Sequence, residues 1–143
     1  MPDPLVPVRA MWAADAASAA LGIRLEELGE GRARVSMVVR DDMVNGHDLC
    51  HGGLIATLAD SAFALACNSR GPVTVAAGFS VDFLQPGRRG QTLHADAREV
   101  SLRGRSGVYD VTVRADDPVG GEVVAEFRGR SRALGGPTGR TGG

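Results

Sequence analysis

The chain has 143 residues, 43% of them hydrophobic, and a formal net charge of −1. This length suits one domain around one core, and this composition excludes an intrinsically disordered chain. The near-neutral charge argues against a nucleic-acid-binding or membrane-surface protein, because both need a cationic face.

The first part of the chain predicts one helix and one β-hairpin. Residues 1–7 are proline-rich and are expected to form a loose lead-in. The Ala-rich stretch 8–21 contains few helix breakers and is followed by a glycine, so it predicts a helix. Residues 32–40 carry apolar side chains at alternate positions, as a strand with one buried face does. Residues 23–31 resemble its hairpin partner, which would turn at Gly29–Gly31.

The middle of the chain predicts a polar loop followed by a buried helix. Residues 41–51 are polar and contain the turn-forming pair Asn45-Gly46, so they are expected to form a loop. Residues 52–68 are apolar nearly all round the helical wheel. Because a surface helix would show a polar face, this helix is predicted to be buried, and residues 69–72 should end it.

The remainder of the chain predicts four strands. They are expected over residues 73–84, 91–102, 106–115 and 122–134, with turns at 103–104 and 118–121 and a disordered tail over 135–143. The spacing favours antiparallel pairing of consecutive strands. One sheet wrapped around one central apolar helix would make a single α+β domain over residues 1–143.

Asp60 is the first candidate for chemistry, because it lies in the middle of the predicted buried helix. Carboxylates are rarely buried unless they are paired or functional. The alternatives to a functional role are that the Asp60 carboxylate is exposed at a subunit interface or that hydrogen bonds satisfy it. Desolvation would raise the pKa of Asp60, which suits a general base.

The start of the same helix supplies three further candidates. The first backbone N–H groups of a helix have no internal acceptor and lie at the positive end of its dipole. Gly52 and Gly53 let a ligand oxygen approach these groups, as in an oxyanion hole, or they serve only a tight turn. His51 can cap the helix or orient the loop. Asn45 can hold the loop through its side chain or donate its amide N–H to a substrate carbonyl.

The spacing between these candidates predicts an oligomer. Gly52 and Asp60 are eight residues apart, which is about 12 Å along a helix. One substrate carbonyl cannot touch both residues of the same chain. If both act on one substrate, they come from different subunits, and the protein is at least a dimer.

At these residues the sequence resembles a known family. The strings MVNGHDLCHGGLIATLADSAFALACNSRG, VDFLQPG, GVYDVTV and FRGRSRALGG closely resemble the PaaI-type thioesterases of phenylacetate catabolism, which have the hotdog fold, and the similarity runs over residues 20–136. The resemblance implies hydrolysis of acyl-coenzyme A, with aryl-acetyl esters favoured, and a homo-oligomer that is usually a tetramer.

The resemblance also implies roles for individual residues. Asp60 matches the carboxylate that activates the attacking water or attacks the carbonyl itself, and the Gly52 N–H matches the group that polarises this carbonyl. Asn45 matches a residue that helps to hold the carbonyl or the loop, and His51 one that supports the group near the sulfur. Further substrate-binding candidates are Gly53, Thr57 and Ser80. Thr74 is an alternative to Ser80 as the hydroxyl that steers the water.

The arginines are candidates for binding the phosphates of coenzyme A. All 16 basic residues are arginines, and the guanidinium group of arginine can form two parallel hydrogen bonds to a phosphate. The candidates are Arg88, Arg89, Arg128 and Arg130, with Arg132, Arg103 and Arg105 in competition. A solvated outer sheet face is the alternative explanation for the alternating arginines of residues 128–132.

The other reactive side chains predict neither a metal site nor a thiol nucleophile. The three histidines lack metal-ligand spacing. Cys50 is adjacent to His51, a geometry that rarely aligns for proton transfer, and Cys67 is expected to be a small core residue. No cofactor is expected, since coenzyme A is part of the substrate.

The sequence also bears on location and on two competing functions. The chain lacks a recognisable signal peptide and any stretch near the ~18 apolar residues of a membrane span, so a cytoplasmic protein is expected. A hotdog hydratase or dehydratase would need an acid–base pair around the acyl α and β carbons. A module that only binds acyl-coenzyme A would have little reason to bury Asp60.

Overall fold

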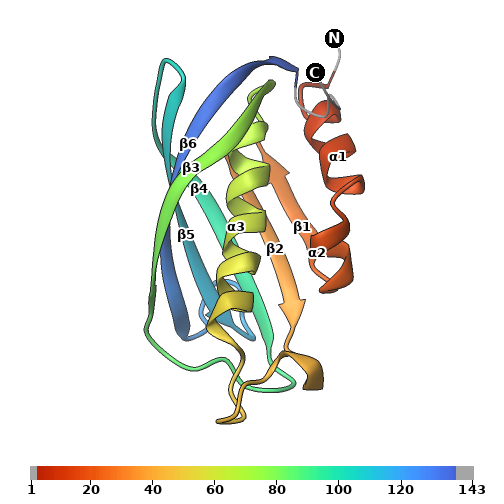
Figure 1. Ribbon diagram of the computed structural model, residues 1–143, viewed down its shortest axis with the longest axis vertical. Helices are drawn as coiled ribbons and strands as arrows, with labels where there is room; N and C mark the ends of the chain where they lie inside the picture. Colours follow the sequence, from red (N-terminus) through yellow and green to blue (C-terminus); the bar gives the residue numbers. More distant parts are fainter. Residues whose placement is uncertain (1–2, 138–143) are drawn as a thin grey trace.

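The computed structural model describes residues 3–137 as one antiparallel sheet curled around a long helix (Figure 1). Six elements precede β3: α1 (Val6–Ala13), α2 (Ala16–Ala20), β1 (Arg24–Gly29), β2 (Arg32–Val38), the short 3-10 helix η1 (Asp41–Met43) and the central helix α3 (Gly52–Asn68). Four strands follow: β3 (Pro72–Phe83), β4 (Thr92–Arg103), β5 (Ser106–Ala115) and β6 (Val123–Pro137). The predicted α+β class is confirmed, and the bounds of α3 and β5 are those expected.

The N-terminal helix differs from its prediction, because it is two helices rather than one. Asp15 stands between α1 and α2 in an extended conformation, and its side chain accepts a hydrogen bond from the Ser18 N–H. An N-cap of this kind satisfies a free backbone donor and starts a new helix. The expected lead-in is also shorter than residues 1–7, since α1 begins at Val6.

The order of the strands differs from simple consecutive pairing. The sheet runs β1-β2-β4-β5-β6-β3, so β3 pairs with β6 and not with β4, which follows it in the sequence. The connection from β3 to β4 therefore passes below α3 to the other side of the sheet (Figure 1). β2 takes the place beside β4, with Val35 opposite Ala95. As a result, β3 is an edge strand.

The core lies between α3 and the inner face of the sheet. Phe63 of α3 packs its ring 5.6 Å from that of Tyr109 and 5.8 Å from that of Phe127. A side chain at Gly129 would sit 2.8 Å from the Phe63 ring, so the absence of a Cβ there lets the helix approach β6. Burial of these large side chains is the main stabilising contribution to the domain.

The prediction that α3 is buried holds for most of its surface but not for one strip. Apart from Gly52 and Leu54 in the first turn, the positions that are not buried recur every three or four residues and therefore lie on one side of the helix: Gly53, Ala56, Thr57, Asp60 and Ala64. In Figure 1, α1 and α2 lie along one side of α3 and β3 along the other. We call these five residues the open strip, because no other element of the described chain covers it fully.

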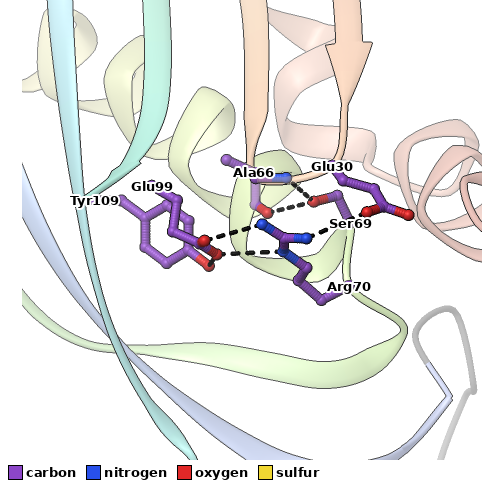
Figure 2. Close-up of polar contacts among 7 residues, drawn as sticks. Glu30, Ala66, Ser69, Arg70, Glu99 and Tyr109 are labelled. Atoms are coloured by element: carbon purple, nitrogen blue, oxygen red, sulfur yellow. Dashed lines mark hydrogen bonds and ion pairs between the residues drawn. The ribbon is translucent and has the colours of Figure 1, made fainter. Parts of the chain in front are cut away.

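The far end of α3 is tied to the β1–β2 hairpin and to β4 (Figure 2). The Ser69 hydroxyl donates to the Ala66 carbonyl and accepts from the Gly31 N–H. The Arg70 guanidinium bridges the carboxylates of Glu30 and Glu99. These contacts anchor the C-terminal end of α3, which makes the helix a rigid support for the residues at its other end.

The remaining structural predictions concern the ends of the chain. β6 continues to Pro137, beyond the predicted end at residue 134, while the rest of the predicted disordered tail (138–143) lies outside the described residues. Among the helices within residues 3–137, none combines the length and apolar composition that a membrane crossing requires.

Candidate active site

The loop before α3 is organised by Asn45. Its side-chain oxygen accepts hydrogen bonds from the N–H groups of His47 and Leu49, and its backbone N–H donates to the Leu49 carbonyl. These bonds assign the amide orientation, because both partners are donors. The Asn45 side-chain NH2 is therefore the end that points away from the loop backbone, and it makes no hydrogen bond within residues 3–137.

His51 is the N-cap of α3. Its Nδ1 accepts a hydrogen bond from the Gly53 N–H at 3.2 Å. This bond assigns His51 a helix-capping role, and it engages the N–H of Gly53, which was predicted to bind substrate.

Gly52, the first residue of α3, has the free backbone donor. Within the described part of the chain its N–H donates to no acceptor, since the first N–H groups of a helix lack internal partners. The positive end of the helix dipole lies at the same place. An oxygen that gains negative charge would be stabilised here.

A pocket of about 300 Å³ opens beside this N–H. It is lined by Asn45, Leu49, Cys50, Gly52, Ile55 and residues 83–87. Phe83 and Leu84 are 51% and 54% exposed, so both present apolar surface to whatever enters. The volume is at the lower end of the range for small-molecule sites, and an apolar lining with a few polar groups is typical of them.

The sequence reasoning missed most of this lining. Residues 83–87 lie in the string VDFLQPG, which was quoted for its resemblance but not assigned to the site. Phe83, the last residue of β3, lies against Gly52, where a Cβ would meet the ring at 3.1 Å. The sequence did not predict this contact between Phe83 and Gly52, because it depends on the pairing of β3 with β6.

Asp60 lies half-buried on the open strip, three residues after Thr57. Burial raises the pKa of the Asp60 carboxyl, and the negative charge of Asp15 raises it further. Thr57 donates its hydroxyl to the Gly53 carbonyl, four residues earlier in the helix. Asp60 therefore has the perturbed environment typical of a functional carboxylate.

The predicted site residues fall into two groups within one chain. Asn45, His51 and Gly52 gather at the start of α3, while Asp60 is about two turns further along the helix. The pocket beside Gly52 does not include Asp60. Ser80 is in neither group: it lines a separate cavity with Asp110, Glu126 and Arg128 on the face of the sheet turned away from α3.

Thr74, the alternative to Ser80, is also distant from the start of α3. Its backbone N–H donates to the Asn68 side chain, and its hydroxyl donates to the Pro72 carbonyl. Asn68 is the last residue of α3 and Pro72 the first residue of β3, so Thr74 lies at the opposite end of the helix from Gly52.

The arginine candidates differ in their partners. Arg89 pairs with Asp41 and Asp48, and Arg128 forms a two-bond ion pair with Asp110. Arg88 has no ion-pair partner within residues 3–137 and follows Gly87 at the edge of the pocket. Arg130 also lacks a carboxylate partner among the described residues, and it lines a separate groove together with two of its competitors, Arg103 and Arg132.

The cysteines behave as predicted from their neighbours. Cys67 is buried in the core, and burial raises the pKa of its thiol to about 12. Burial also raises the pKa of Cys50, whose thiol donates to the His51 carbonyl and not to the imidazole. Neither thiol is activated as a nucleophile. Within residues 3–137, no three His, Cys, Asp or Glu side chains gather as a metal site requires.

Comparison with known proteins relates this arrangement to enzymes. A model of the thioesterase superfamily matches residues 47–122. The acyl-coenzyme A thioesterase PaaI of Escherichia coli (strain K12) is 45% identical over 127 residues, which are 89% of this chain and 89% of the relative.

Solved structures give the same relationship. The E. coli PaaI protein from the phenylacetic acid degradation operon has a TM-score of 0.89 at 42% identity, covering 95% of this chain and 96% of its own. A mutant of the phenylacetic acid degradation protein PaaI of Thermus thermophilus has a TM-score of 0.79 at 40% identity, covering 84% and 100%. A Streptococcus mutans protein, solved with bound acetyl CoA, has a TM-score of 0.75 at 28% identity, covering 81% and 91%.

Proposed function

Because the chain belongs to the thioesterase superfamily and is an acyl-coenzyme A thioesterase of the hotdog fold, we propose that its preferred substrates are aryl-acyl esters of coenzyme A. Phenylacetyl-CoA and its ring-hydroxylated relatives are the first candidates. The observation that carries this proposal is the apolar pocket beside the free N–H of Gly52. The association of two relatives, at 42% and 40% identity, with phenylacetic acid degradation supports the same acyl group.

In the proposed reaction, Asp60 acts as the general base and Gly52 as the oxyanion donor. The carboxylate takes a proton from a water molecule as its oxygen forms a bond to the thioester carbonyl carbon. The carbonyl oxygen becomes negative and accepts a hydrogen bond from the Gly52 N–H. When the intermediate collapses, the C–S bond breaks, and the thiolate of coenzyme A leaves and takes up a proton. A thiolate is a good leaving group, so a strong general acid is not required.

We further propose that each site combines Gly52 of one subunit with Asp60 of another. β3 supports this arrangement, because it is a twelve-residue edge strand with exposed apolar side chains at Val75, Phe79 and Phe83. Unprotected edges of this kind pair with another chain. Antiparallel pairing of two β3 strands around a two-fold axis would also run the two α3 helices antiparallel. The Gly52 end of one helix would then lie toward the Asp60 half of the other.

Thiol release from a panel of coenzyme A esters tests the substrate class. We expect phenylacetyl-CoA and hydroxyphenylacetyl-CoA to give a kcat/KM at least about tenfold above acetyl-CoA and butyryl-CoA, because aromatic burial in an apolar pocket contributes more than one or two methylenes do. Product analysis should show the free acid. Equal rates across the panel would contradict the aryl preference, and an enoyl product would indicate a hydratase. Binding of every ester without thiol release would indicate a binding module.

Among the arginines, we propose Arg88 for the phosphates of coenzyme A. It follows Gly87, which lines the pocket, and it has no carboxylate partner among the described residues, whereas Arg89 is already paired. Arg88→Ala is expected to raise KM roughly three- to tenfold with little change in kcat, since one exposed charged contact is lost. The wild-type KM should rise with added salt, and this rise should be smaller in the variant. Arg24→Ala, another exposed arginine without an ion-pair partner in residues 3–137, is the matched control. Equal KM values in all three proteins would exclude this role for Arg88.

A further inference from the structure

A chain of three hydrogen-bonding groups joins the N-terminal helices to the middle of α3. The Ser18 hydroxyl lies 2.8 Å from the Ser61 hydroxyl and donates to Asp15 at 2.7 Å. Because a serine hydroxyl carries one proton, Ser61 is the donor to Ser18. The Ser18 N–H also donates to the Asp15 carboxylate, at 2.9 Å. Ser61 follows Asp60 directly, so this chain ends one residue from the proposed base.

The two serines are buried in an otherwise apolar contact. Ser18 is 2% exposed and Ser61 is 7% exposed. A buried hydroxyl without a partner would cost stability, so the pair sets the position of α2 against α3 more tightly than apolar packing alone. Figure 1 shows α2 beside α3, and the bond between Ser18 and Ser61 joins the two helices.

The same chain of hydrogen bonds holds a second carboxylate near Asp60. Asp15 accepts both hydrogen bonds from Ser18 and so is fixed in place. Within residues 3–137, Asp15 is the charged side chain whose field acts on Asp60. The other titratable neighbour is Cys67 of α3, which stays a neutral thiol because burial raises its pKa to about 12. In the same part of the chain, no arginine on α1, α2 or the inner face of the sheet offsets the charge of Asp15 at Asp60.

We propose that Asp15 and Ser18 are positioning residues for Asp60, which the Ser18–Ser61 hydrogen bond aligns and the fixed Asp15 carboxylate makes a stronger base. This inference rests on the proposed function, because it assigns Asp60 the role of base. It adds a role for α2, which carries none of the residues proposed above for the site. The sign follows from Coulomb repulsion: a nearby negative charge favours the protonated form of Asp60 and strengthens its attraction for the proton of water.

Asp15→Asn tests the electrostatic part. Asparagine is also a good N-cap, so the variant keeps the bond from the Ser18 N–H but loses the charge and the second oxygen, which accepts from the Ser18 hydroxyl. Ser18→Ala, which loses this hydroxyl bond but keeps the charge, separates the two effects. We expect the acid limb of the kcat/KM profile to move to lower pH, because the pKa of Asp60 falls. The plateau rate should fall by less than about tenfold, because a weaker base remains in place. Asp3→Asn is the matched control, since Asp3 likewise accepts a bond from a backbone N–H, that of Leu5. An acid limb that coincides in wild type, Asp3→Asn and Asp15→Asn would overturn the electrostatic role.

Ser18→Ala and Ser61→Ala test the alignment. Each is expected to lower kcat roughly two- to tenfold at constant KM, the range that one lost hydrogen bond allows. The double variant should lose no more than Ser18→Ala alone, since that variant already removes the bond between the two hydroxyls. Additive losses, or a rise in KM alone, would show that the hydroxyls do not act together on Asp60.

A direct titration separates this inference from the proposed function. Carbon-13 NMR of aspartate carboxyls in the intact, substrate-free enzyme follows Asp60, whose signal is identified by its absence in Asp60→Asn. We expect Asp60 to titrate at lower pH in Asp15→Asn than in wild type. If Asp60→Asn abolishes activity but this titration is unchanged, the role of Asp15 fails alone. If the pKa of Asp60 falls in Asp15→Asn but Asp60→Asn stays active, Asp60 is not the base, although the electrostatic interaction between Asp15 and Asp60 is real.

Discussion

Replacing Asp60 with asparagine is expected to lower kcat for acyl-CoA hydrolysis by roughly 10²–10⁴-fold, the contribution of a general base. Asparagine has nearly the same shape but can neither accept the proton of the attacking water nor attack the carbonyl. KM should change little, because the coenzyme A portion of the substrate contacts other residues. Thiol release under saturating ester measures the effect. Retention of most of the wild-type rate would remove Asp60 from the mechanism.

The stability of the same variant distinguishes loss of chemistry from loss of fold. The pKa of Asp60 is raised in the folded state by burial and by Asp15. The fold therefore binds this proton more tightly than the unfolded chain does, and ionisation at neutral pH destabilises the fold. Asp60→Asn should unfold at the same or a higher temperature at pH 7, and this difference should vanish as pH falls below the pKa of the unfolded carboxyl. Asp82→Asn, on an exposed position of β3, is the control for both measurements.

Gly52→Pro is expected to lower kcat by roughly 10²–10³-fold, the contribution of one oxyanion donor. Proline lacks the N–H but is favoured at the first position of a helix. His51 already has φ −60° and ψ 129°, the extended conformation that a residue before proline requires. Gly52→Ala is the matched control, because it brings a Cβ toward Phe83, as proline does, but keeps the N–H. Equal losses in the two variants would show that crowding of Phe83, and not the missing donor, is responsible.

A mixture of the two inactive variants tests whether the site is shared. If Gly52 and Asp60 of different subunits serve one substrate, a dimer of one Gly52→Pro and one Asp60→Asn chain has one intact site and one doubly defective site. Random reassociation should restore roughly a quarter of the wild-type activity, because about half of the chains enter mixed dimers. Mixing without dissociation is the control. No recovery after verified subunit exchange would place both groups in the same chain and contradict the proposed assembly.

Local sequence determined α3 and the residues at its start. The run from Gly52 to Asn68 is apolar almost throughout and is bounded by a polar loop and by Ser69–Pro72, so its ends follow from the side chains alone. The same local pattern identified the free donor at Gly52 and the isolated carboxylate at Asp60. The eight-residue separation of these two also follows from helix geometry, without any coordinates.

Tertiary structure decided which distant segments meet. The pairing of β3 with β6 rather than β4 depends on how the whole sheet closes around α3. Backbone hydrogen bonds are the same in every strand, so they do not specify which strands pair. This pairing places Phe83 over Gly52 and turns Ser80 away from the helix. The register of the β5–β6 pair places Arg128 opposite Asp110, its ion-pair partner, whereas Arg88 has no carboxylate partner in residues 3–137.

Asp15 shows most clearly which features local sequence determines and which depend on tertiary packing. Its position three residues before Ser18 is a local capping pattern, and that pattern explains the break between α1 and α2. That the capping carboxylate lies near Asp60, far along the chain, is decided only when α2 packs against α3. Charges act through space and not along the chain, so sequence alone identified the candidate base, and the packed structure identified the groups that set its strength.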